Sequence, residues 1–147
     1  MKSKATAVYL VSCVSQKRKQ MCPARELYVS DWFLKARCYT EASGCCWFIL
    51  SAEHGLVEPD RVIAPYERTL NTMPIAERRA WGNRVSEQLD AVVPSLLHVV
   101  FLAGARYREF LVPILTGRGV TVSVPMAGLR IGEQLRWLRQ HIPPHLA

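Results

Sequence analysis

A carboxylate and an imidazole stand next to each other at one point of the chain, in Ser51-Ala52-Glu53-His54-Gly55. A carboxylate can act as a general acid or base, and an imidazole titrates near neutral pH. Adjacent side chains point in different directions, so we do not expect Glu53 and His54 to bond to each other. Both can still face one pocket from a tight turn that Gly55 permits. Ser51 is predicted to contact the substrate beside them. The alternative is structural: His54 caps the end of a strand and Glu53 is solvated.

A hydroxyl and an ammonium lie two residues apart in the segment that starts at Cys13. Together with backbone N–H groups, Ser15 and Lys17 suit a phosphate or a carboxylate. The segment has no glycine and no P-loop pattern, so a nucleoside triphosphate is not implied. Cys13 is a candidate nucleophile, although nothing in the sequence places a base beside it to form the thiolate. The alternative is a solvated basic turn in which Cys13 is a small buried apolar residue.

An aromatic ring stands beside an acid in Pro65-Tyr66-Glu67, inside a long irregular connection. Stacking on a nucleobase and hydrogen bonding to its edge need these two kinds of side chain. We therefore predict Tyr66 as a substrate-binding residue and Glu67 as a catalytic one. An ordinary packed loop with an exposed acid has the same composition, so the sequence leaves both interpretations open.

Two glycine-containing segments are predicted to begin helices directly after strands. A helix N-terminus favours anions, and Arg106 adds a cation in the first turn of one of them. We predict substrate binding by Gly104, Arg106, Tyr107 and Gly128, with Tyr107 and Tyr66 stacking on a base. Close packing of a helix on a strand also uses glycine, and it is the alternative for both segments.

Each of these segments, except the one with Tyr66, follows an apolar run that is typical of a buried strand, at residues 8–12, 46–50, 98–103 and 120–124. Helices are expected from Asp31 to Gly44, from Thr72 to about Val92, through Leu111 to Gly117, and from Ile131 to Ile142. Strands that alternate with helices predict a three-layer α/β/α sandwich with a mainly parallel four-stranded sheet. In such a sheet ligands bind outside the carboxyl ends of the strands, near a topological switch point. We therefore expect the polar segments to converge on one pocket.

The totals exclude several classes of protein. The 147 residues fit a single domain over residues 1–147, and half of them are apolar, which is against disorder. No apolar run approaches the length of a membrane span or of a signal sequence, so we expect a cytoplasmic protein with no membrane partner. Five cysteines without an export signal predict no disulfides, and Cys13, Cys22 and His54 match no known zinc spacing, so no metal and no cofactor are expected. The net charge of +7 favours a polyanionic partner and is compatible with a protein partner as well.

Read together, six segments resemble one family of small bacterial and phage proteins that share a domain of unknown function. That family is similar to the peroxide-stress protein YaaA and to a domain of archaeosine synthase, and more widely to uracil-DNA-glycosylase-like folds, which are three-layer parallel α/β domains. The resemblance covers nearly the whole chain and implies a connection to nucleic acid or nucleobases. The segments that carry it are residues 10–17, 23–28, 49–56, 65–67, 103–107 and 128–135.

The sequence also departs from the glycosylase pattern. The water-activating acid and the tyrosine that those enzymes carry after the first strand are missing, and Cys13, Ser15 and Lys17 stand there instead. Excision of uracil in the manner of those enzymes is therefore not implied. If base or glycosidic-bond chemistry occurs, Glu53 or Glu67 must supply the carboxylate.

Three functional hypotheses follow from the sequence. The first is an enzyme that acts on a nucleobase or an N-glycosidic bond in nucleic acid or a nucleotide, with Lys17 and Ser15 on phosphate, Glu53 as the reactive carboxylate and His54 polarising the base or leaving group. The second is a non-catalytic DNA- or RNA-binding protein in which the basic residues contact phosphates. The third is an enzyme of small nucleotides.

Overall fold

The central sheet is the element that positions everything else in this protein, and a computed structural model describes it within residues 7–146. Four strands run parallel: β1 (Ala7–Ser12), β3 (Cys46–Ser51), β6 (His98–Leu102) and β7 (Thr121–Ser123). A fifth strand, β4 (Gly55–Val57), pairs antiparallel with β3, and the spatial order is β4-β3-β1-β6-β7. The predicted mainly parallel α/β architecture is confirmed, but the predicted number of four strands is wrong.

The extra strand arises from a tight reversal of the chain directly after β3. Gly55 has φ +77°, a left-handed conformation that side chains with a Cβ rarely adopt, and it pairs with Ser51 across the turn. Leu56 and Val57 then continue along the edge of the sheet in the opposite direction, opposite Leu50 and Ile49. The turn was recognised in the sequence, but the three-residue strand after it is too short for a periodicity signal.

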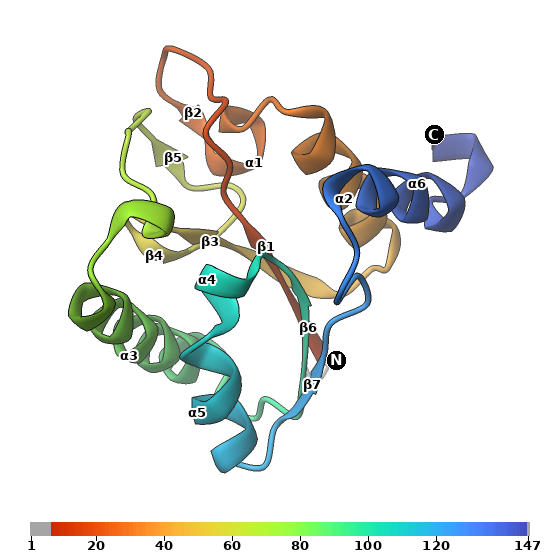
Figure 1. Ribbon diagram of the computed structural model, residues 1–147. Coiled ribbons are helices and arrows are strands. Elements are labelled where there is room, and N and C mark those ends of the chain that lie inside the picture. Colours follow the sequence, from red (N-terminus) through yellow and green to blue (C-terminus); the bar gives the residue numbers. More distant parts are fainter. Residues whose placement is uncertain (1–6, 147) are drawn as a thin grey trace.

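Helices cover both faces of the sheet (Figure 1). On one face α2 (Asp31–Ala42) packs beside α6 (Ile131–His141), and on the other α3 (Ile75–Val92) packs beside α5 (Leu111–Gly117). Between them the strands are buried on both sides, so that Val8, Leu10 and Val11 of β1 have no exposed surface. This two-sided burial explains the nearly continuous apolar strands of the sequence.

The predicted helices have the right positions, with differences at their ends. The expected start at Thr72 falls in a short 3-10 helix, η1 (Leu70–Thr72), and α3 begins only after Pro74, whose ring nitrogen has no hydrogen to donate. A separate short helix, α4 (Ala105–Arg108), precedes α5. A second 3-10 helix, η2 (Pro144–Leu146), follows α6. None of the helices described for residues 7–146 is long and apolar enough to cross a membrane.

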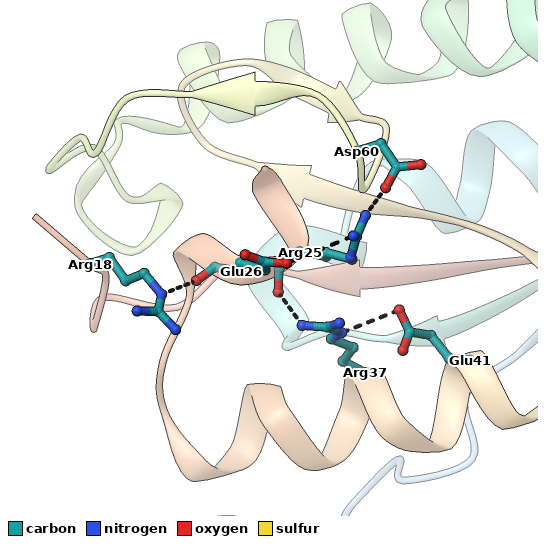
Figure 2. A network of polar contacts seen from close by, with 6 residues as sticks. All are labelled: Arg18, Arg25, Glu26, Arg37, Glu41 and Asp60. Atoms are coloured by element: carbon teal, nitrogen blue, oxygen red, sulfur yellow. Dashed lines mark hydrogen bonds and ion pairs between the residues drawn. The ribbon is translucent and has the colours of Figure 1, made fainter. Parts of the chain in front are cut away.

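A small subdomain lies beyond the carboxyl end of β1. It contains the two-stranded sheet of β2 (Cys22–Pro23) and β5 (Val62–Ile63) and the short helix α1 (Ala24–Leu27). Figure 2 shows the polar contacts that join α1 to its neighbours. Arg25 pairs with Asp60 across to the β4–β5 connection, and Arg37 of α2 donates to the backbone carbonyl of Arg25 at 3.0 Å.

These contacts fix the segment that follows β1. Arg18 donates through its side chain to the backbone carbonyl of Glu26 at 2.8 Å and through its backbone N–H to that of Leu27 at 2.8 Å. Lys17 forms an isolated antiparallel bridge with Tyr28. Each exposed ion pair contributes little stability by itself, but the backbone hydrogen bonds hold residues 16–18 against residues 27–29.

Candidate functional site

The sheet has a topological switch point between β1 and β6. From β1 the chain passes to β3 on one side, and it later returns to place β6 and then β7 on the other side. In open α/β sheets the crevice outside the carboxyl ends of two such strands is where ligands bind. A cavity of about 530 Å³ lies at this point. It is lined by residues 12–15 and 17 from the end of β1 and the loop after it, by residues 104–107 after β6, and by residues 67–69 and 71 before α3.

The charged side chains around the cavity are mostly cationic. Lys17, Arg68 and Arg106 line it together with the carboxylate of Glu67. The ammonium of Lys17 donates to the backbone carbonyl of Ser15 at 3.5 Å, and the guanidinium of Arg106 reaches Glu109 only at 3.9 Å. An excess of cations with weak intramolecular partners favours a negatively charged ligand.

Cys13 and Tyr107 form part of the buried floor. The backbone N–H of Cys13 donates to the carbonyl of Leu50 at 2.9 Å, which extends the β1–β3 ladder by one residue and fixes the thiol at the end of the strand. The Sγ atom of Cys13 lies 3.3 Å from the hydroxyl of Tyr107, and each residue is only 7% exposed. Burial, with the neighbouring Cys13 as a further cause, raises the pKa of the Tyr107 phenol.

This burial leaves little of the Tyr107 ring accessible for the predicted stacking on a base. Its ring packs perpendicular to Trp81 of α3, with the ring centres 5.6 Å apart. Its hydroxyl also accepts a hydrogen bond from the backbone N–H of Leu70 at 3.5 Å. Tyr107 therefore lines the cavity but does not offer a ring face to a ligand.

Tyr66 lies beneath Lys17 at the centre of a hydroxyl network. Its hydroxyl is 2.6 Å from that of Tyr28 and accepts a hydrogen bond from Ser51 at 2.8 Å. The Lys17 ammonium lies over its ring, 4.6 Å from the centre. Burial, followed by the proximity of Cys13, raises the pKa of both phenols well above the ordinary value, so the network is neutral at physiological pH.

Ser51 belongs to this network and not to the cavity. It is fully buried, and its hydroxyl accepts hydrogen bonds from the backbone N–H groups of Glu53 and His54 at 3.2 and 3.0 Å. In the structure Ser51 anchors the turn and Tyr66 and does not line the cavity. Its direct contact with a substrate stays a prediction.

Glu53 and His54 are not among the residues that line the cavity. They lie in the tight turn between β3 and the antiparallel β4, where Glu53 is exposed and its carbonyl accepts a hydrogen bond from Arg84 at 3.2 Å. The His54 ring packs edge-on against Tyr66, with centres 5.6 Å apart. Partial burial, and then the charge of Arg61, lowers the pKa of this imidazole. The structure thus places neither member of the predicted reactive pair at the cavity that Lys17 and Ser15 line.

The two predicted glycines meet in a smaller space beside the cavity. Gly104 lines both the cavity and this space of about 200 Å³, whereas Gly128, at φ +80°, lines the smaller space and not the cavity. Sequence reasoning missed Arg68, Thr69 and Asn71, which come from the long connection before α3. The signal that points to them is the length of that connection, because long irregular connections in a small domain are often functional.

The residues that could hold a metal are few. Within residues 7–146 no group of three His, Cys, Asp or Glu side chains lies close enough together to bind an ion. The five cysteines are free thiols. The chemistry available in the cavity is therefore that of one carboxylate, three cations, hydroxyls and a buried thiol.

Comparison with known proteins bears on the family. A search of curated proteins and a search of solved structures each gave no match. A family model matches residues 8–140, which includes all of the sheet except Ala7 and every segment that lines the cavity. The chain therefore belongs to the family of unknown function DUF6884.

Proposed function

We propose that the protein is an enzyme that binds a nucleotide, free or within nucleic acid, in the switch-point cavity and acts on its base or N-glycosidic bond. The observation that carries the proposal is the position of the cavity, at the carboxyl ends of β1 and β6, together with its three cations. Its volume of about 530 Å³ falls within the usual range for small-molecule sites. The predicted resemblance to glycosylase-like folds supports the same class of substrate.

The cations suit the phosphate of such a ligand. Lys17 projects from the loop after β1 and Arg106 from α4, so the two approach the cavity from opposite sides of the switch point. Arg68 contributes from the connection before α3, where it also pairs with Glu77 at 3.3 Å. A phosphate bound between them exchanges hydration for charge-assisted hydrogen bonds.

Glu67 is assigned the reactive role. Of the described side chains that line the cavity, only that of Glu67 is a carboxylate. Cleavage of a glycosidic bond develops positive charge on the sugar, and a nearby carboxylate stabilises that charge or activates the attacking water. Glu53, the other carboxylate that the sequence offers, does not line the cavity.

Cys13 receives no role as a nucleophile. Its thiol is 7% exposed, and its hydrogen-bond partner is the Tyr107 phenol. Because burial raises the pKa of that phenol, Tyr107 stays protonated at neutral pH and has no basic form that could accept a proton from the thiol.

The test is base release or base exchange on unmodified and modified DNA, RNA and nucleotides. Glu67→Gln is expected to abolish turnover while binding stays equal or becomes tighter, because a negative charge near the phosphate is removed. Glu53→Gln is the matched control, and we expect it to retain full activity. Absence of turnover on all substrates, or full activity of Glu67→Gln, overturns the proposal.

A second function is favoured by the exposed basic residues that follow Lys17. Arg18 and Lys19 are exposed and line a hollow of about 500 Å³ with Met21, Cys22 and the acidic Glu26. In a non-catalytic nucleic-acid-binding protein, these residues contact phosphates. Binding then falls with salt with a slope near −0.9 per neutralised phosphate on duplex DNA. The double variant Arg18→Ala, Lys19→Ala removes two positive charges and is expected to weaken binding to nucleic acid. Glu67→Gln is expected to leave this binding unchanged or make it tighter, and the wild-type protein is expected to show no turnover.

A further inference from the structure

A second cleft adjoins the switch-point cavity on the side of α2 and α6. Its volume is about 490 Å³, and it shares Ser12, Val14, Ser15 and Gly104 with the cavity. The two spaces meet at these four residues, which we call the ridge. Gly104 is exposed on this ridge, and a Cβ atom added to it would meet nothing within 4 Å. A ligand longer than one nucleotide can therefore pass over the ridge from one space to the other.

The chemistry of the cleft differs from that of the cavity. Among the described residues that line it, none carries a charged side chain. Val14, Trp32 and Ile131 supply apolar surface, and Gln16 and Gln134 supply amides. Flat apolar surface with neutral hydrogen-bonding groups suits a nucleobase and does not suit a phosphate.

The amide of Gln134 is held in one orientation. Its Oε1 accepts from the indole N–H of Trp32 at 2.8 Å, and its Nε2 donates to the backbone carbonyl of Leu129 at 2.9 Å. Trp32 is itself nearly buried at the start of α2. The wall of the cleft is therefore ordered before any ligand arrives, which lowers the entropic cost of binding.

Ile131 is the exposed apolar residue of the cleft. It is the first residue of α6 and is 61% exposed, although it lines the cleft. Ile75 occupies the same position in α3 and is 54% exposed, but it lines neither space. The two isoleucines thus form a matched pair, one inside the cleft and one outside.

We propose that the cleft holds the base next to the nucleotide in the cavity, so that the substrate is a nucleic-acid strand of at least two nucleotides. This inference rests on the proposed function. The cavity alone has the volume of a nucleotide site, and the cleft provides a second site of similar size without charge. A phosphodiester then crosses the ridge at Ser15 and Gly104, beside Lys17.

The experiment compares a mononucleotide, a dinucleotide and a tetranucleotide, all single-stranded and fluorescently labelled, with the full-length protein. We expect the dinucleotide to bind about tenfold more tightly than the mononucleotide, the gain that one stacked base typically provides. Ile131→Glu places a charge in the cleft and is expected to remove that gain while mononucleotide affinity is unchanged. Ile75→Glu is expected to leave both affinities unchanged.

The outcomes separate this inference from the proposed function. If no nucleotide or strand binds, both are overturned. If the mononucleotide binds and additional nucleotides add no affinity, only the inference is overturned. If Ile131→Glu weakens the mononucleotide as much as the dinucleotide, one nucleotide spans both spaces, and the strand-specific inference is wrong.

Discussion

The ammonium of Lys17 lies 4.6 Å from the centre of the Tyr66 ring, and the hydroxyl of Tyr66 is held between Tyr28 and Ser51. A cation over an aromatic face is attracted by the negative potential of the ring. The hydroxyl network fixes the ring, and the ring in turn restrains the Lys17 side chain at the edge of the cavity. Tyr66 is thus a positioning residue for the cation that we assign to phosphate.

Two substitutions at Tyr66 separate its ring from its hydroxyl. Tyr66→Phe keeps the ring but leaves the hydroxyls of Ser51 and Tyr28 without this partner, and we expect a loss of about 1–3 kcal/mol in the free energy of unfolding. Tyr66→Leu also removes the aromatic face. Chemical denaturation and affinity for a 5′-phosphorylated nucleotide measure the two effects.

The comparison at Tyr66 has a defined outcome. We expect nucleotide affinity to be retained in Tyr66→Phe and to fall severalfold in Tyr66→Leu, in line with a cation–π contribution of ~0.5–2 kcal/mol. Equal affinities of the two variants contradict the positioning role. The corresponding nucleoside without phosphate serves as the control ligand and is expected to show no difference between them.

Gly104→Phe is expected to fold normally and to lose ligand binding. The backbone at Gly104 has φ −71° and ψ 170°, which any residue can adopt, and a Cβ there meets no neighbour within 4 Å. The phenyl ring then stands on the ridge between cavity and cleft. Gly117→Phe, at a glycine with equally open surroundings on α5, is the control for the substitution itself. Thermal unfolding and nucleotide binding are measured for both, and retained binding in Gly104→Phe contradicts the assigned location of the site.

Gly55→Ala is expected to destabilise the protein more than Gly44→Ala does. Both glycines have left-handed conformations, with φ +77° and +73°. At Gly44 an added Cβ meets nothing, whereas at Gly55 it falls 2.3 Å from the Oε1 atom of Gln88, which accepts a hydrogen bond from Leu56. We expect about 1–2 kcal/mol for Gly44→Ala from the backbone alone, and clearly more for Gly55→Ala. Equal losses in urea unfolding indicate that Gln88 moves away at no cost.

Stability is expected to fall in mild acid partly because of His54. Burial and the charge of Arg61 lower the pKa of this imidazole in the folded protein below its value in the unfolded chain. As the pH falls through the ordinary histidine range near 6.5, the unfolded state therefore binds more protons than the folded state. The resulting loss of unfolding free energy is absent above that pH and develops below it. His54→Gln is expected to flatten the dependence of the unfolding free energy on pH between about 7 and 5. An unchanged slope contradicts the assignment.

The sequence predicted the strands better than it predicted the site. Residues 8–12, 46–50 and 98–103 are continuous apolar runs, and the structure confirms each within a residue or two. Such runs are unambiguous because the sheet is buried on both faces. The strand β4 was missed because Gly55–Val57 follows the turn directly and has no pattern of its own.

The order of the strands explains why Glu53 does not line the cavity. The turn with residues 53 and 54 lies at the carboxyl end of β3, whereas the cavity lies at the switch point between β1 and β6, on the other side of β1. Residues that enter a cavity from an irregular connection, such as Arg68 and Asn71, show no periodicity, so that only the length of the connection points to them. Which loops carry polar residues was therefore predictable, but which of these loops meet at one cavity depended on the order of the strands.

The central position of β1 determines the order in which the cavity can form on the ribosome. β1 is the first strand to be synthesised, and it pairs with β3, which is complete at residue 51, and with β6, which is complete only at residue 102. Pairing with β3 can begin early, but one edge of β1 stays unpaired while the next fifty residues are translated. Residues 104–107, which close the cavity, emerge later still. A nascent chain therefore carries the loop with Lys17 long before the cavity exists, and a ligand of the cavity, as we propose it, can stabilise only a chain that has been translated past α4.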